Sequence, residues 1–177
     1  ANPYAQMRKD FGYEFCRSES EKNPFVAGPL KRTDCSLVSD GAAALVLMRE
    51  STANKLGLTI IAKIHGHATH AQAPNLFTTA PIGAVKKLYA KTGWSSSNVD
   101  LFEINEAFAA VPMAAMHDLD IPHSKINIHG GACALGHPIG ASGARIIVTL
   151  LGALKKTGGK RGVASLCIGG GEATAMA

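Results

Sequence analysis

The chain has 177 residues, of which 46% are hydrophobic and 18% charged, and its formal net charge is +5. This length and apolar content suffice to bury one substantial core, whereas no apolar run approaches the roughly 20 residues of a membrane-spanning helix. Lysines and arginines are dispersed over loops and helix ends, so the positive charge indicates a solvated surface and no nucleic-acid partner.

The cysteines and the two ends of the chain indicate its compartment and completeness. Four cysteines without a C-x-x-C pair favour reduced thiols in a cytoplasmic compartment over a disulfide framework: Cys16, Cys35, Cys133 and Cys167. The sequence opens without Met in a polar, helix-like stretch and stops in a strand-like run. We therefore expect a piece of a longer chain, whose upstream part is free to carry a targeting segment.

The first third of the chain changes character near Asp40. Residues 1–35 are polar and broken by prolines, as in a lid or linker. Gly41 to Met48 is a small-residue turn running into a continuous apolar stretch, which predicts a strand buried on both faces. Ser51 is a suitable N-cap for a short helix ending at Gly57, and residues 59–67 are typical of a strand.

Helices and strands alternate in the remainder. Pro81 in a first turn and Gly93 at the end delimit a predicted helix, and residues 101–104 form a short predicted strand followed by a helix over 106–116. Further predicted elements are a strand at 126–128, a helix over 139–156, and strands over 163–167 and 173–177. This alternation predicts an α/β fold in which helices pack on a layered mixed sheet.

A glycine-rich loop over residues 128–145 holds a single histidine, His137. Its glycines allow positive φ angles and close approach to a ligand, and Pro138 stiffens the turn that carries the ring. The loop lacks the G-K-[ST] of a phosphate-binding loop and the spacing of a dinucleotide fingerprint. Taken by itself, a lone histidine in such a loop is more often structural than catalytic.

Two further polar residues stand at strand ends. Cys167 ends a strand ahead of three glycines, where a thiol can serve as an acid or base, although most free cysteines are simply buried. Asn105 stands at a strand-to-helix junction, where it either caps the helix or points into the cleft beyond the strand.

Together, these segments resemble the thiolase family. Its N-E-A-F strand end, G-H-P-x-G-x-x-G loop and C-x-G loop occur here in that order, at 105–108, 136–143 and 167–169. With a family-like DGAAA at Asp40, the resemblance covers roughly residues 34–177. It implies a thiolase-like fold and a C-terminal portion divided into the end of a lid or loop region (1–35), the last strand segment of the N-terminal half (36–50) and the C-terminal half (51–177).

The resemblance implies an acyl-CoA C-acyltransferase that condenses acyl-CoA thioesters or cleaves 3-ketoacyl-CoA through an acyl-cysteine. His137 would activate the nucleophilic cysteine and contribute to an oxyanion hole, which a water held by Asn105 completes. Cys167 would carry the proton of the α-carbon. The amide of Gly169 would contribute to a second oxyanion hole. One preorganised donor of this kind is worth about 100 to 1,000-fold in rate.

Four further residues match substrate contacts of the family. Ser36 would bond the pantetheine arm, Ala107 and Phe108 would line its tunnel, and Phe77 would border the acyl pocket, with a surface-turn serine as the alternative for Ser36. The coenzyme A thioester is the substrate, and no cofactor is implied. Family members form dimers or tetramers.

The nucleophile is the main departure from the family pattern. Neither Cys16, Cys35 nor Cys133 stands in the expected C-x-S-G-like turn, and a complete thiolase is about twice as long. The N-terminal half of the same enzyme is thus an expected partner, without which we predict no turnover.

Three rival interpretations remain open from the sequence. A ketoacyl synthase shares a related histidine loop but lacks the second cysteine in a C-x-G turn. A non-catalytic acyl-CoA or lipid-carrier protein would keep the fold without the chemistry. A metal site at His65, His67 and His70 lacks a completing cysteine or carboxylate, so no metal is predicted.

Overall fold

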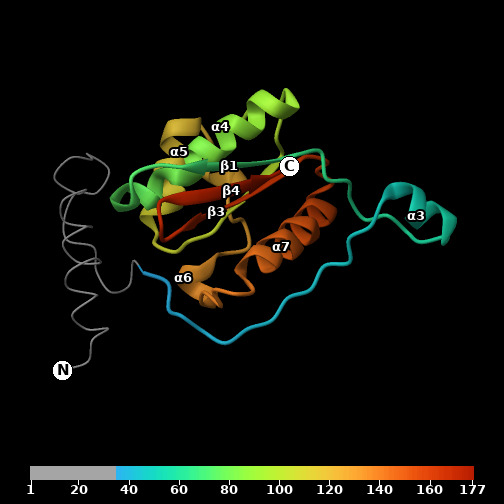
Figure 1. Ribbon diagram of the computed structural model, residues 1–177, viewed down its shortest axis with the longest axis horizontal. Helices are drawn as coiled ribbons and strands as arrows, with labels where there is room; N and C mark the ends of the chain where they lie inside the picture. The colour runs from blue at the N-terminus through green and yellow to red at the C-terminus, as the bar shows by residue number, and fades with distance from the viewer. Residues whose placement is uncertain (1–34) are drawn as a thin grey trace.

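A computed structural model describes residues 35–177 of the protein (Figure 1). The predicted lid or loop region over 1–35, with Cys16, lies outside these residues except for Cys35. Within residues 35–177, four strands form one mixed sheet in the order β1-β4-β3-β2, in which β3 runs parallel to β2 and antiparallel to β4. The strands are β1 (His67–Ala71), β2 (Leu101–Ile104), β3 (Gly162–Ile168) and β4 (Glu172–Met176).

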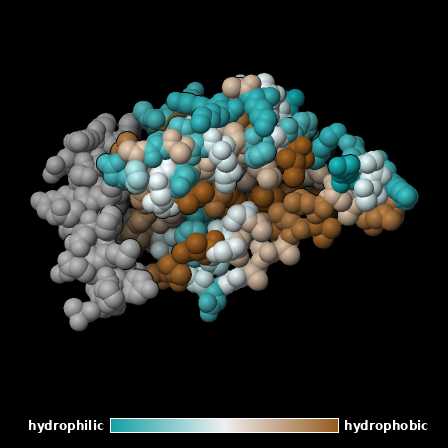
Figure 2. Space-filling model, in the orientation of Figure 1, coloured by the Kyte–Doolittle hydropathy of each residue, from teal (hydrophilic) through white to brown (hydrophobic). Residues whose placement is uncertain are grey.

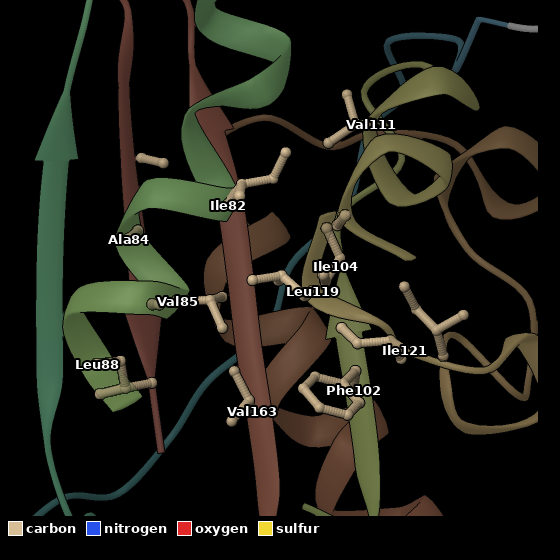
Figure 3. Packing of buried hydrophobic residues seen from close by; sticks show 14 of the residues in the cluster. Ile82, Ala84, Val85, Leu88, Phe102, Ile104, Val111, Leu119, Ile121 and Val163 are labelled. Carbon is tan, nitrogen blue, oxygen red and sulfur yellow. The ribbon is translucent and has the colours of Figure 1, made fainter. Parts of the chain in front are cut away.

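The sheet separates two layers of helices (Figure 1). α4 (Ala80–Thr92) and α5 (Ala110–Leu119) cover one face, and α7 (Ser142–Thr157) covers the other. Because alternate residues of a strand point to opposite faces, Phe102 packs with α4 and α5 whereas Leu101 packs with α7. Figure 3 shows the core between the sheet and α4 with α5. The predicted α/β class with helices on a mixed sheet is confirmed.

α4 begins and ends where the sequence predicts. Pro81 occupies its first turn, and Gly93 takes a left-handed conformation with φ of 72° while donating its N–H to the Tyr89 carbonyl. Val85 and Leu88 point into the core and are fully buried. The helix is therefore fixed by its end signals and by its apolar face together.

α7 begins at Ser142, later than the predicted start at Ile139. Residues 138–141 instead form a turn in which the Ala141 N–H bonds the Pro138 carbonyl at 2.8 Å. The helix ends at Thr157, and its C-cap Gly158 takes a left-handed conformation with φ of 76°. Residues at helical spacing bury one side of α7 against the sheet: Ile146, Leu150 and Ala153.

Short helical segments complete the description. They are α3 (Glu50–Lys55), η3 (Pro74–Thr79), η4 (His123–Lys125) and α6 (Ala132–Leu135). None of the helices within residues 35–177 combines the length and apolar composition that crossing a bilayer requires.

The predicted buried strand at 41–48 is wrong for the described structure. This segment is extended but pairs with no strand of the sheet, and Val46 is 87% exposed. A strand buried on both faces needs hydrogen-bonded neighbours and covering helices, which residues 35–177 do not place beside it. Figure 2 shows apolar side chains exposed in the region of α7 and toward α3.

Three other predicted elements are also corrected. The strand expected at 59–67 begins only at His67. Residues 59–64 are exposed and belong to no strand, whereas the His65 N–H bonds the Ala177 carbonyl and the Gly66 carbonyl accepts from the Ala177 N–H, each at 2.9 Å. The segment 126–128 forms only a single bridge, between Ile126 and Phe102. Ser51 lies inside α3, whose N-cap is Arg49.

The helix predicted over 106–116 begins at Ala110. Residues 106–109 are held instead in a turn, where the Glu106 carboxylate accepts a 2.9 Å hydrogen bond from the Cys133 N–H. A tertiary contact therefore outweighs the local preference for helix at this junction.

Gly83 of α4 faces β1, and we expect Gly83→Ala to destabilise the fold. An added Cβ would overlap the His70 ring. Overpacking typically costs about 1–3 kcal/mol, against a gain of about 1 kcal/mol in helix propensity. Thermal unfolding followed by circular dichroism should show a lower melting temperature.

The matched control is Gly152→Ala on α7, where an added Cβ meets no atom within 4 Å. This variant should gain about 0.5–1 kcal/mol from helix propensity alone. A Gly83→Ala protein as stable as the Gly152→Ala protein would contradict the packing between His70 and α4.

Candidate active site

The candidate site lies at the carboxyl ends of two neighbouring parallel strands. Asn105 directly follows β2, and its N–H bonds the Ser165 carbonyl of β3 at 2.9 Å. Cys167 lies near the end of β3 itself. Because the carboxyl ends of parallel strands share one edge of a sheet, Asn105 and Cys167 stand at the edge where α/β folds commonly bind ligands.

The loop that carries His137 is pinned by the extended segment near the start of the described residues. The His137 N–H donates to the Leu37 carbonyl at 2.7 Å, and the Ser39 N–H donates to the His137 carbonyl at 3.4 Å. Gly136 has φ of 92°, and a side chain there would also overlap Ser39. Glycine is thus required at this position of the loop.

The His137 ring is held through both of its nitrogens. Its Nδ1 lies 2.6 Å from Ser142 Oγ, and that hydroxyl donates to the Pro138 carbonyl at 3.1 Å. Ser142 Oγ therefore accepts a hydrogen bond from Nδ1–H, which leaves Nε2 as the unprotonated nitrogen. Asn105 Nδ2 lies 3.5 Å from this Nε2. The geometry thus presents a basic nitrogen at the edge of the sheet.

The electrostatics favour the neutral imidazole. Burial lowers the pKa of His137, and the positive charge of Arg145 lowers it further. The ring is therefore neutral near pH 7, with its Nε2 lone pair available to take a proton.

Glu106 of the N-E-A-F motif positions the histidine loop. Besides the Cys133 N–H, its carboxylate accepts a 3.2 Å hydrogen bond from Asn127 Nδ2. Gly131 approaches this carboxylate so closely that a Cβ would overlap it. The motif thus joins the end of β2 to the loop that carries His137.

Cys167, near the end of β3, lies on the side of the sheet that α4 and α5 cover. Its half-buried side chain packs against the core under α4 and α5, as does Phe108. Burial raises the pKa of the Cys167 thiol to about 11, so the group carries its proton at neutral pH. Gly169 is exposed in the turn between β3 and β4.

The four predicted substrate contacts lie next to one another. The Ser36 N–H and hydroxyl donate to the Ala107 carbonyl at 3.3 and 3.0 Å. The neighbouring Phe108 ring meets the Phe77 ring edge-on, with centroids 6.1 Å apart. The structure therefore brings together residues separated by up to 72 positions, and the Ser36 oxygen keeps a lone pair for a ligand.

Three site residues were missed by sequence reasoning: Glu103, Ser142 and Arg145. Glu103 interrupts an otherwise apolar strand, which was the available signal. Ser142 and Arg145 follow His137 by five and eight positions, but only the turn over 138–141 brings them to the ring. Within residues 35–177, no group of three or more His, Cys, Asp or Glu side chains is placed to hold a metal.

Several known proteins resemble this chain in sequence. The sequence profile described as "Thiolase, C-terminal domain" matches residues 58–177. "Acetyl-CoA acetyltransferase 2" of Arabidopsis thaliana is 52% identical over 149 residues, or 84% of this chain and 37% of the relative. "Acetyl-CoA acetyltransferase, cytosolic" of Mus musculus is 50% identical over 84% of this chain and 38% of the relative.

Solved structures resemble the fold as well. The crystal structure of the Bacillus anthracis acetyl-CoA acetyltransferase superposes with a TM-score of 0.82 at 42% identity, over 84% of this chain and 38% of that one. The Ascaris suum Acat5 thiolase in complex with coenzyme A gives a TM-score of 0.76 at 39% identity, over the same shares. The chain thus spans somewhat more than a third of the length of these relatives.

Proposed function

Because the chain belongs to the thiolase family, we propose that it is the catalytic C-terminal portion of an acyl-CoA C-acyltransferase, in the manner of its acetyl-CoA acetyltransferase relatives. The single observation that carries this proposal is the fixed His137 ring. Its Nδ1 is bonded to Ser142 and its basic Nε2 stands beside Asn105. This arrangement supports the roles that the family resemblance assigns to these residues.

In the proposed cleavage reaction, His137 Nε2 takes the proton of a nucleophilic cysteine supplied by a complementary segment. The resulting thiolate attacks the keto carbonyl of a 3-ketoacyl-CoA. The protonated ring then donates to the oxyanion, assisted by a water held by Asn105. The bond between the α- and β-carbons breaks, and the shortened acyl group stays on the cysteine.

Cys167 donates the proton that the α-carbon of the leaving acetyl-CoA enolate requires. The departing enolate of acetyl-CoA takes a proton at its α-carbon from the Cys167 thiol, while the Gly169 amide donates to its oxygen. A raised pKa suits this step, because the thiol holds its proton until a strong base forms beside it. The Cys167 thiolate then takes the thiol proton of a second coenzyme A, whose sulfur attacks the acyl-enzyme. The cysteine thiolate that leaves recovers its proton from His137, which restores the starting state. In the condensing direction the same steps run in reverse.

In the proposed complex, the pantetheine arm of the substrate lies along Ser36, Ala107 and Phe108, and Phe77 borders the acyl group. The contacts among these residues support a shared lining, and the coenzyme A complex of the Ascaris relative supports the ligand class. A coenzyme A thioester is the substrate, and no separate cofactor takes part.

The complementary partner is the N-terminal half of the same enzyme type. Exposed apolar side chains on either side of α3 support such a partner, since Val46 before the helix is 87% exposed and Ile61 after it is 82% exposed. We further propose a homo-dimer or homo-tetramer in the cytoplasm, in line with the relative of Mus musculus that is named as cytosolic.

A chimera tests the function. Residues 58–177 of this chain replace the matching C-terminal domain of the Arabidopsis relative, which supplies the remainder of the enzyme. We expect the chimera to cleave acetoacetyl-CoA in the presence of coenzyme A, followed by loss of absorbance of its enolate. The 177-residue chain alone should show no turnover in the same assay, because none of its cysteines stands in a nucleophile turn.

Two outcomes would count against the proposal. Turnover by the isolated chain would show that a complementary nucleophile is unnecessary. A folded chimera that binds acetoacetyl-CoA without turnover would favour the non-catalytic carrier protein instead.

A further inference from the structure

A buried ion pair lies behind the contact between Asn105 and His137. Glu103 of β2 is only 2% exposed, and its Oε2 lies 3.8 Å from Arg145 Nη1 on α7. Leaving a single charge at such a depth is costly, so the two residues depend on each other. Neither takes part in the reaction steps proposed above.

The Arg145 guanidinium also reaches the candidate site. Its Nη2 donates to Asn105 Oδ1 at 3.4 Å, while Nε and Nη1 are buried without a hydrogen-bond partner among the described residues. An arginine that leaves two buried N–H groups unsatisfied is held there at a cost in free energy.

The contact with Arg145 decides how the Asn105 amide is oriented. A side-chain amide has one accepting and one donating end, and Arg145 has only donors. Its bond to Oδ1 therefore turns the Nδ2 group toward His137 Nε2. An amide turned the other way would present an acceptor to Nε2 and favour a proton on that nitrogen.

We propose that Arg145, held in place by Glu103, is a positioning residue that fixes the Asn105 amide and so acts together with Ser142 to keep His137 Nε2 unprotonated. The fork of the guanidinium spans the carboxylate on one side and the amide on the other, which a single lysine ammonium does not reproduce. Burial raises the pKa of Glu103 to about 7, with Glu106 adding to and Arg145 opposing the rise, so Glu103 holds Arg145 most firmly above neutral pH.

The tautomer of His137 tests this inference without any turnover. Nitrogen-15 spectra of the histidine-labelled 177-residue chain are recorded at about pH 8, above the usual pKa of histidine, and His137 is assigned from a His137→Asn sample. The wild-type chain should show a proton on Nδ1 and none on Nε2. Arg145→Met should shift a measurable fraction to the form protonated at Nε2.

Two further variants keep the result interpretable. Arg161→Met removes an exposed arginine that lies over the Trp94 ring, and it should leave the His137 tautomer unchanged. If Arg145→Met unfolds because Glu103 is left unpaired, the double variant Glu103→Gln/Arg145→Met removes both charges and should show the same shift. A wild-type tautomer in the folded variant would overturn the inference.

The catalytic consequence rests on the proposed function and is measured separately in the chimera. In the chimera, Arg145→Met removes the charged hydrogen bond to Asn105 and should lower kcat roughly 10- to 100-fold with little change in KM. An inactive wild-type chimera would count against the proposed function but not against the tautomer result. An active chimera that is insensitive to Arg145→Met would overturn the positioning role.

Discussion

Replacing Cys167 by alanine in the chimera is expected to lower the rate of condensation about 100 to 10,000-fold, because the proton shuttle for the α-carbon is lost. Acetyl transfer from acetyl-CoA to the nucleophilic cysteine should survive, since that step requires His137 but not Cys167. Intact-protein mass spectrometry with acetyl-CoA should therefore show an acetyl-enzyme that accumulates without forming acetoacetyl-CoA.

Cys133→Ala is the matched control, since Cys133 is the other cysteine of the transferred domain. Its side chain lies on α6 and its thiol contacts the Glu106 carbonyl, so its loss should change the condensation rate little. Equal losses from both alanine variants would indicate a structural effect. A Cys167→Ala chimera that condenses normally would remove Cys167 from the mechanism.

The fold was predictable wherever the residues that determine an element lie within it. α4 follows from Pro81, Gly93 and an apolar face, and β3 and β4 follow from small apolar residues on either side of a glycine turn. The exposed course of segment 41–48 could not be predicted, because its apolar residues indicate burial but do not identify the neighbouring elements that would bury them. Its neighbours are absent from residues 35–177, and the segment runs exposed.

The motifs of the candidate site were predictable from the sequence, but the residues that hold the motif side chains in place were not. Asn105 and His137 were identified in sequence, and the structure brings them within 3.5 Å. Arg145 and Ser142 carry no motif signal that a surface helix would not also show. Their roles depend on a turn that sets the start of α7 and on the burial of Glu103, which are tertiary properties.

His137→Ala in the chimera should cause the largest loss of activity, at least about 1,000-fold in kcat. The substitution removes the base that takes the nucleophile's proton and a donor to the oxyanion. These two contributions act through one ring, so their effects do not simply multiply. Acetyl-enzyme formation should fail as well, which separates this variant from Cys167→Ala by mass spectrometry.

His129→Ala provides the control, because His129 is exposed on the same loop. It should retain nearly full activity, which would show that the loop tolerates loss of an imidazole.

Ser142 provides a separate test of the tautomer argument. With Ser142 bonded to Nδ1, every catalytic task of His137 must pass through Nε2. A Ser142→Ala chimera should therefore lose activity in the same direction as His137→Ala but less severely, since the ring remains and only its orientation is released. If His137→Ala still formed acetyl-enzyme at the wild-type rate, the nucleophile would have to be activated by a group outside this chain.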